Sequence, residues 1–132
     1  MEQLRKAQAA MPYRLLVSGS RDWQDRRTIA LALNQQHIAW GRPTDAVLVV
    51  GDATGADAIA AELWEKAGLV VERHVADWDQ HGKRAGMIRN SEMVNTGVDA
   101  CLGFSLNNSP GTHHCTTLSR KAGITTEVFE QS

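Results

Sequence analysis

Short apolar runs alternate with amphipathic segments along most of the chain. A run that is almost continuously apolar, as at 47–50, is typical of a strand buried on both faces of a parallel sheet. Apolar residues that recur every three or four positions, as in 56–67, are typical of a helix with one buried face. The pattern predicts strands at 13–17, 45–50, 69–75, 98–104 and 124–129, and helices at 25–37, 56–67, 83–95 and 112–122.

Strands that alternate with helices predict an α/β fold. We expect a single Rossmann-like three-layer domain of about five parallel strands in the order 3-2-1-4-5. The third strand has a more alternating pattern, so it belongs nearer an edge of the sheet. The expected organisation is a weakly ordered or helical leader at 1–12 and the Rossmann-like domain at 13–132, with loops at 76–82 and 105–111.

The composition is that of an ordinary globular protein, and it narrows the functional classes. With a formal net charge of −1 over 132 residues, the protein lacks the overall positive charge on which non-specific nucleic-acid binding depends. No apolar run approaches the ~20 residues of a membrane span. The N-terminus also lacks the apolar core of a signal peptide. We therefore expect a cytoplasmic protein in which Cys101 and Cys115 do not form a disulfide.

Three short turns, 18–23, 51–57 and 109–112, each follow a predicted strand and lead toward a predicted helix. In α/β proteins this arrangement brings backbone N–H groups and the positive end of a helix to an anionic ligand. With the strand order 3-2-1-4-5, a crevice forms between the first and fourth strands, where the loops 19–23 and 105–112 meet. The turns therefore predict a nucleotide-type site on a parallel sheet.

The turn at 51–57 offers several candidate contacts. Gly51 and Gly55 let the backbone turn tightly and approach a ligand, because no Cβ is in the way. Thr54 adds a hydroxyl, and Asp57 lies in the first helical turn, where its charge favours the helix dipole. The alternative is that the glycines only form the turn and Asp57 only caps the helix.

The turn at 18–23 carries Arg21, whose planar and permanently charged donor group suits a phosphate or a carboxylate. Trp23, which follows two residues later, either stacks on a base or packs beneath the loop. A surface arginine is usually solvated, but the position of Arg21 after the first strand favours a role in binding.

The segment after the third strand contains further candidates. Asp77 is placed to accept hydrogen bonds from ribose hydroxyls, and Trp78 is either a packing residue or a platform for a base. Arg89 and Asn90 lie inside the following predicted helix, so they contribute only if the tertiary structure brings them to the site.

The last predicted helix begins near Gly111 and Thr112, where its N-terminus can hold an anion. The adjacent residues His113, His114 and Cys115 do not predict a metal site. Neighbouring residues on a helix point in different directions, and no partner His or Cys stands at zinc-site spacing.

These turns and the residues around them form a recognisable set of motifs. The motifs are Gly19-Ser20-Arg21-Asp22-Trp23, Gly51-Asp52-Ala53-Thr54-Gly55-Ala56-Asp57, Ala76-Asp77-Trp78, His81-Gly82-Lys83, Ala85-Gly86, Ile88-Arg89-Asn90 with Met93, and Gly111-Thr112. Together they resemble the SLOG superfamily, and within it the YspA/YpsA-related branch, over nearly all of 13–129. Relatives in that superfamily are the LOG cytokinin-activating hydrolases and the DNA-processing DprA proteins.

The resemblance implies a Rossmann-like domain of bacterial or phage origin that binds nucleotides or nucleotide-derived signals of the NAD or ADP-ribose class. The sequence departs from the LOG pattern Pro-Gly-Gly-x-Gly-Thr-x-x-Glu, because Cys115 stands where the catalytic Glu would fall. Asp52 also replaces the second glycine of the Gly-Gly-x-x-Gly-x-Asp turn. Whether the protein is an enzyme therefore stays open.

The leading hypothesis is a binding module, a sensor or sequestering protein, that needs no cofactor and no metal. One alternative is a hydrolase that cleaves an N-glycosidic or related bond of a nucleotide, with Asp52, Asp57 and Asp77 as catalytic candidates. A second alternative is single-stranded DNA binding, as in DprA. The expected partner is a nucleotide-like small molecule and not a membrane, and so small a unit is compatible with a homo-oligomer. The predicted ligand-binding residues are Gly19, Ser20, Arg21, Asp22, Gly51, Thr54, Gly55, Asp57, Asp77, Trp78, Arg89, Asn90, Gly111 and Thr112.

Overall fold

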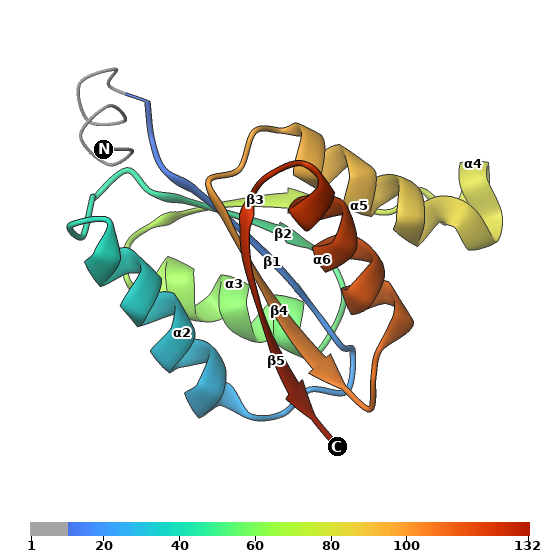
Figure 1. Cartoon of the computed structure of the whole chain (residues 1–132), viewed down its shortest axis with the longest axis horizontal. Coiled ribbons are helices and arrows are strands. Elements are labelled where there is room, and N and C mark those ends of the chain that lie inside the picture. Colours follow the sequence, from blue (N-terminus) through green and yellow to red (C-terminus); the bar gives the residue numbers. More distant parts are fainter. Residues whose placement is uncertain (1–10) are drawn as a thin grey trace.

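The protein folds into a five-stranded sheet flanked by helices, as seen in a computed structural model that describes residues 11–132 (Figure 1). The elements in chain order are β1 (Arg14–Gly19), α2 (Arg26–Ala39), β2 (Val47–Gly51), α3 (Ala56–Lys66), β3 (Val70–His74), α4 (Trp78–His81), a 3-10 turn (Gly82–Arg84), α5 (Ala85–Asn95), β4 (Ala100–Leu106), α6 (Pro110–Lys121) and β5 (Thr125–Gln131).

All neighbouring strands pair in parallel, and their order is β3-β2-β1-β4-β5. This confirms the predicted α/β fold and strand order, and it places β3 at an edge. The central strand β1 pairs with β2 on one side and with β4 on the other. The strand order therefore branches at β1, with β2 and β3 on one side of it and β4 and β5 on the other. That branching creates the topological switch point at which ligands bind in open parallel sheets.

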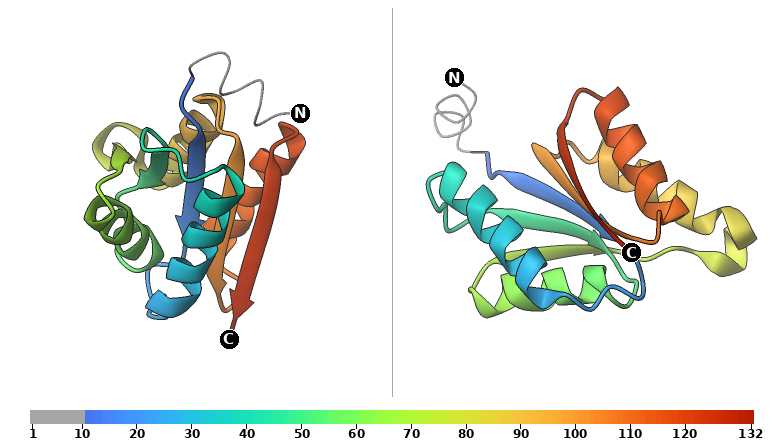
Figure 2. Two further views of the ribbon diagram at one scale, coloured as in Figure 1. Left: turned by 90° about the vertical axis from the view of Figure 1, so that its left-hand side faces the viewer. Right: turned by 60° about the horizontal axis from the view of Figure 1, so that its bottom comes forward.

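Helices cover both faces of the sheet, with α2 and α3 on one face and α5 and α6 on the other (Figure 2). Side chains alternate between the faces along each strand. In β1, Leu15 and Val17 belong to the larger apolar cluster, whereas Leu16 belongs to the smaller one that Met93 and Cys115 share. The two cores explain why the strands are apolar on both faces.

Local sequence signals account for several element boundaries. Asp25 caps α2 by accepting a hydrogen bond from the backbone N–H of Thr28 at 3.1 Å. The helix α6 begins at Pro110, two residues before the predicted start, because proline is favoured in the first helical turn.

The segment after β3 differs from the prediction. The predicted loop at 76–82 contains the short helix α4, which Asp77 caps by accepting from the backbone N–H of Gln80 at 3.0 Å. The predicted helix at 83–95 begins with a 3-10 turn, and α5 proper begins at Ala85. So short a helix has no apolar periodicity to reveal it, since a single turn presents too few positions.

The predicted leader at 1–12 falls largely outside the described residues. Met11 and Pro12, the two residues of it that the structure describes, precede β1 without belonging to a helix or strand. Within 11–132 no helix combines the length and the apolar character that crossing a membrane requires.

Candidate functional site

A hollow of about 440 Å³ opens at the carboxyl ends of β1 and β4, at the switch point of the sheet. It lies between the loop after β1, the loop and first turn of α6, and the α4–α5 segment. Its lining residues are Gly19, Ser20, Arg21, Asp22, Ala53, Trp78, Lys83, Gly86, Met87, Asn90, Leu106, Asn107, Ser109, Pro110, Gly111 and Thr112.

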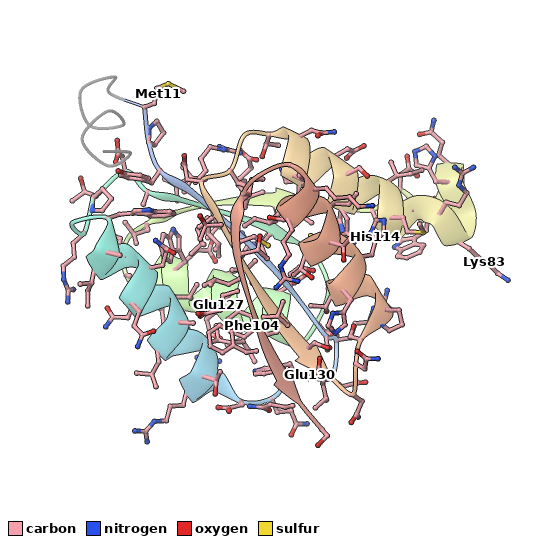
Figure 3. The ribbon with its side chains drawn as sticks, viewed as in Figure 1. Met11, Lys83, Phe104, His114, Glu127 and Glu130 are labelled. Carbon is pink, nitrogen blue, oxygen red and sulfur yellow. The ribbon has the colours of Figure 1, made fainter. Side chains whose placement is uncertain are left out.

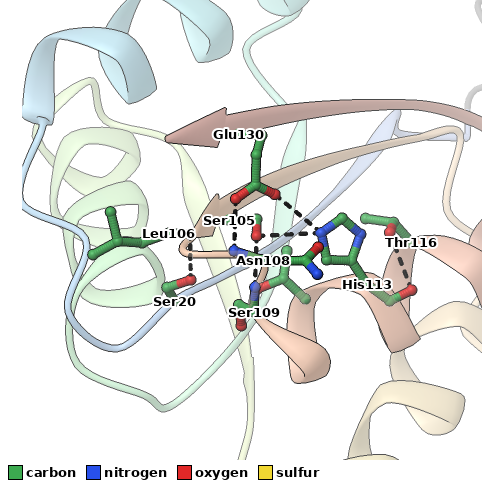
Figure 4. A network of polar contacts seen from close by, with 9 residues as sticks. Ser20, Ser105, Leu106, Asn108, Ser109, His113, Thr116 and Glu130 are labelled. Atoms are coloured by element: carbon green, nitrogen blue, oxygen red, sulfur yellow. Dashed lines mark hydrogen bonds and ion pairs between the residues drawn. The ribbon is translucent and has the colours of Figure 1, made fainter. Parts of the chain in front are cut away.

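Ser20 fastens the two strand ends that form the back of this hollow. Its backbone N–H donates to the carbonyl of Phe104 at 2.9 Å, and its hydroxyl accepts from the backbone N–H of Leu106 at 2.8 Å (Figure 4). The neighbouring position 19 requires glycine, because a Cβ there would collide with Ala56 and would lie 2.9 Å from the Phe104 carbonyl oxygen. The loop after β1 is therefore held tightly against β4 and α3.

The first turn of α6 presents an open helix end to the hollow. Ser109 is the N-cap residue, yet its side chain makes no capping hydrogen bond; instead its Oγ accepts from the Thr112 hydroxyl at 3.1 Å. Gly111 is exposed, and no atom lies within 4 Å of the position that a Cβ would take. The early N–H groups of a helix lack partners within the helix, so this end can hold an anion.

Asn90 supports that turn from α5. It is 5% exposed, and its Nδ2 donates to the Gly111 carbonyl at 3.3 Å and lies 3.1 Å from the His114 Nδ1. The donor role of Nδ2 makes the His114 Nδ1 an acceptor. Asn90 therefore fixes the end of α6 against α5.

The charged residues that line the hollow are Arg21, Lys83 and Asp22, which leaves one more cation than carboxylate. Arg21 is exposed, and its Cζ lies 5.8 Å from the ring centroid of Trp78. Lys83 lies at the outer end of the α4–α5 segment (Figure 3). Together with the positive end of α6, these groups make the hollow suited to an anionic ligand.

The turn at 51–57 packs against the loop after β1. Gly55 has a φ of 72°, and a Cβ there would collide with the carbonyl oxygens of Ser20 and Arg21. The backbone N–H of Ala56 donates to the Ser20 carbonyl at 3.1 Å, and the Thr54 hydroxyl donates to the Arg21 carbonyl at 3.2 Å. The N-terminus of α3 is thus joined to the neighbouring loop.

Asp57 is buried at the start of α3, with 4% of its surface exposed. One carboxylate oxygen accepts from the backbone N–H of Ala53 at 3.3 Å, and the other has no hydrogen-bond partner among the described residues. Burial raises the pKa of Asp57 from 3.8 to about 7, although the nearby Arg89 guanidinium acts in the opposite direction. Asp57 is therefore largely protonated in slightly acidic solution.

Gly51 allows Asp57 and Arg89 to approach each other from opposite faces of the sheet. A Cβ at Gly51 would lie 2.8 Å from the Asp57 Oδ2 and 3.0 Å from the Arg89 Cζ. Arg89 also forms an ion pair with Asp52 at 2.8 Å.

Two further hollows adjoin this region. One, of about 220 Å³, is lined by Arg21, Asp52, Ala53, Thr54, Trp78 and Arg89. The other, of about 490 Å³, lies beside α3 and β3 and is lined by Gly51, Asp52, Ala53, Asp57, Ala58, Ala61, Glu62, Glu65, Lys66 and Arg73.

Comparison with known proteins identifies the family. The sequence model of YAcAr, described as the YspA, cpYpsA-related SLOG family, matches residues 13–81. The chain belongs to this SLOG family. A relative, the Gene 61 protein of Mycobacterium phage D29, is 46% identical over 118 residues, which cover 84% of this chain and 91% of that protein. No solved structure matches the chain.

The SLOG family match confirms the resemblance and includes the loops 19–23 and 51–57, but it ends before α5 and α6. The structure brings residues inside the matched range 13–81 together with residues that follow it, at 83–90 and 106–112, around one hollow. The predicted site residues that line the switch-point hollow are Gly19, Ser20, Arg21, Asp22, Trp78, Asn90, Gly111 and Thr112.

The remaining predicted residues of this SLOG domain lie beside that hollow or serve the fold. Thr54 and Arg89 line the adjoining 220 Å³ hollow, and Gly51 and Asp57 line the hollow beside α3. Gly55 lines a further hollow, of about 430 Å³, which Arg21, Asp22 and residues of α3 also line. Asp77 caps α4. Trp23 is 2% exposed and contacts Phe104 edge to face, so it packs beneath the loop and does not offer a face to a base.

Several lining residues were not among those predicted from the sequence, chiefly Met87, Leu106 and Asn107. Asn107 and Asn108 have φ values of 54° and 55°, a conformation in which asparagine is enriched. The Asn-Asn pair between a strand and a Ser-Pro helix start was therefore a usable signal. Met87 carries no comparable local signal, because only the packing of α5 brings it to the hollow.

A serine, a histidine and a glutamate meet beside α6 without forming a catalytic triad (Figure 4). The His113 Nε2 lies 3.3 Å from the Ser105 Oγ and 3.0 Å from the Glu130 Oε1. A triad needs one ring nitrogen for the nucleophile and the other for the acid, whereas here one nitrogen faces both. Ser105 is also fully buried, and its hydroxyl accepts from the backbone N–H of Ser109 at 2.9 Å.

This cluster secures the loop in front of α6. Glu130 accepts from the backbone N–H of Asn108 at 2.7 Å. A hydrogen bond from Ser105 and the contact with Asn108 hold the pKa of Glu130 below its usual value.

The side chains of His113, His114 and Cys115 point to three different places, as the helical spacing predicts. His113 faces Glu130, His114 faces Asn90, and Cys115 is fully buried, where it contacts Cys101 and Ser18. The position that the LOG glutamate would occupy therefore faces the core. Within 11–132 no three His, Cys, Asp or Glu side chains are grouped so that they could hold a metal ion.

Proposed function

We propose that this SLOG domain binds a nucleotide or a nucleotide-derived small molecule, of the NAD or ADP-ribose class, in the switch-point hollow. In this proposal the anionic group lies at the N-terminus of α6. The observation that carries it is that an uncapped helix end, Arg21 and Lys83 all line one hollow. A positive helix end, a planar guanidinium and an ammonium together match a phosphate.

The volume is compatible with a ligand of this size. The hollow of about 440 Å³ lies within the range of small-molecule sites and continues into the 220 Å³ hollow through Arg21, Ala53 and Trp78, which line both. Asn90 and Ser20 hold the surrounding backbone in place, so the site is largely formed before a ligand arrives.

A sensor or sequestering role in the cytoplasm follows from the same proposal, because nucleotides are available there. The two cysteines are free thiols, which suits a reducing compartment. The relative from a mycobacteriophage adds that proteins of this kind occur in phages.

The first test is a thermal-shift screen with NAD, ADP-ribose, cyclic ADP-ribose, the nucleoside monophosphates and a short single-stranded DNA, each analysed by mass spectrometry after incubation. A ligand at 100 times its Kd stabilises the folded state by about 2.7 kcal/mol and so raises Tm by several degrees. A stabilising ligand that stays intact supports a binding module. A stabilising ligand that is consumed indicates a hydrolase, and no shift with any compound contradicts the proposal.

Arg21→Ala tests the placement of the anion. Loss of a hydrogen bond to a charged group costs about 1.5–3 kcal/mol, so we expect affinity to fall about 10- to 100-fold with little change in Tm. The matched control is Arg120→Ala, which removes the same charge from the exposed last turn of α6. If the wild type and the Arg21 variant bind a nucleotide with equal affinity, Arg21 does not contact the anionic group.

A further inference from the structure

An exposed aromatic ring stands at the edge of the switch-point hollow. Trp78 is 46% exposed and Met87 is 55% exposed, and both line this hollow from the α4–α5 segment. The other tryptophans are less exposed: Trp23 and Trp64 are 2% and 3% exposed, and Trp40 is partly buried and stacks on Tyr13 with ring centroids 4.5 Å apart. The exposed ring of Trp78 and the side chain of Met87 are therefore within reach of a ligand that enters this hollow.

The surroundings of Trp78 favour a planar ligand group. Trp78 lines both the main hollow and the adjoining 220 Å³ hollow, so its ring stands between them. The Arg21 guanidinium lies over that ring at 5.8 Å from its centroid. Cation–π contacts of exposed groups are weak, so a ligand can replace this one at little cost.

We propose that the Trp78 indole is the stacking platform for the base of the bound ligand. On binding, Arg21 leaves the ring and turns to the phosphate, which lies at the N-terminus of α6. This inference rests on the proposed function and assigns the base of the nucleotide to one side chain, a contact that a sugar phosphate or an inorganic anion would lack. Every base has a π-face, so Trp78 supplies affinity for a base and leaves the choice of base to other groups.

Calorimetric titrations with AMP, GMP, CMP, UMP, NAD, ADP-ribose and ribose 5-phosphate test the inference, because all of these except ribose 5-phosphate carry a base. The variants are Trp78→Leu, which keeps an apolar side chain but removes the ring, and Trp78→Phe, which keeps a smaller ring. Trp40→Phe is the matched control, since Trp40 lies at the far end of α2 and outside the hollow. The Tm of each variant verifies that it is folded.

For the wild type we expect at least one nucleotide to bind more tightly than ribose 5-phosphate. Trp78→Leu should weaken nucleotide binding by about tenfold or more, in line with the loss of one base–aromatic stack, and leave ribose 5-phosphate unchanged. Trp78→Phe should restore part of the loss, and Trp40→Phe should behave as the wild type. Nucleotides, but not ribose 5-phosphate, should quench the tryptophan fluorescence, and this quenching should disappear in Trp78→Phe.

Three results would overturn the inference, and they are distinguishable. If Trp78→Leu leaves nucleotide binding unchanged, or weakens ribose 5-phosphate equally, Trp78 is not the base platform, while the proposed phosphate site survives. If none of these compounds binds, NAD and ADP-ribose included, the proposed function fails together with the inference. If Trp78→Leu changes the sedimentation of the protein and not its affinity for nucleotides, the exposed ring is a contact between copies of the chain.

Discussion

Replacement of Asp57 by Asn should make the protein more stable in alkaline solution and leave its stability in acid nearly unchanged. Asp57 is buried, and burial raises its pKa from 3.8 to about 7. Between these two values the folded state holds a proton that the unfolded state has lost, so stability falls as the pH rises through this window. Asn has nearly the same shape, carries no charge, and its oxygen still accepts from the Ala53 N–H.

The size of the effect follows from the two pKa values. One pKa unit corresponds to about 1.4 kcal/mol, so ionisation of Asp57 removes on the order of 4 kcal/mol of stability between pH 4 and pH 8. Asp57→Asn should therefore gain up to this amount over the wild type at pH 8 and almost nothing at pH 4. Arg89, which loses a neighbouring charge in the variant, keeps its ion pair with Asp52.

The assay is urea unfolding of the wild type and the variant at several pH values from 4 to 8. Asp22→Asn is the control, because it makes the same chemical change on an exposed carboxylate, one that lines the switch-point hollow. If the difference between Asp57→Asn and the wild type is the same at pH 4 and pH 8, the buried carboxyl does not titrate as described, and the reasoning from burial is refuted.

Further predictions concern the glycines and the loop before α6. Gly55→Ala should destabilise the fold by about 2 kcal/mol or more, because a Cβ there would meet backbone oxygens and the residue has a positive φ. Gly111→Ala should leave Tm nearly unchanged, because no atom lies near its Cβ position. Equal Tm values for the two variants would contradict the packing at Gly55. Glu130→Gln should speed hydrogen exchange at the Asn108 amide, which donates to the Glu130 carboxylate, and in the wild type the protection should decline as the pH falls toward the depressed pKa of Glu130. Exchange at Asn108 that is slow and equal in both proteins would show that Glu130 does not hold the loop.

The main helices, the strands and the strand order could be predicted from the sequence. Buried parallel strands and amphipathic helices leave strong periodic patterns, and handedness and connection rules then restrict the strand order. The α4 helix left no such pattern, because a single turn held by the Asp77 cap depends on local hydrogen bonds.

Only some residues of the candidate site could be predicted from the sequence. Residues in turns belong to local motifs, whereas others reach the site only through tertiary packing. Arg21 and Gly111 could be predicted because a glycine-containing turn between a strand and a helix has a recognisable form. Gly55 was likewise predicted as a turn glycine, but its close packing against the carbonyls of Ser20 and Arg21 was not, because these residues are more than thirty positions away in the chain. Met87 reaches the hollow only through the packing of α5, which no local motif encodes.

The hydrogen bonds of Ser20 also determine how much of the chain must be synthesised before the hollow can form. Apart from the neighbouring Trp23, its partners are Ala56, 36 positions later, and Phe104 and Leu106, which follow 84 and 86 positions after it. A nascent chain that has emerged only through residue 81, the end of the family match, contains the loop of Ser20 but lacks the opposite wall. Contacts so distant in sequence are made late. Ligand binding would therefore require synthesis at least through Thr112, the last residue that lines the hollow, and a ribosome-bound fragment that stops before β4 would not bind the ligand.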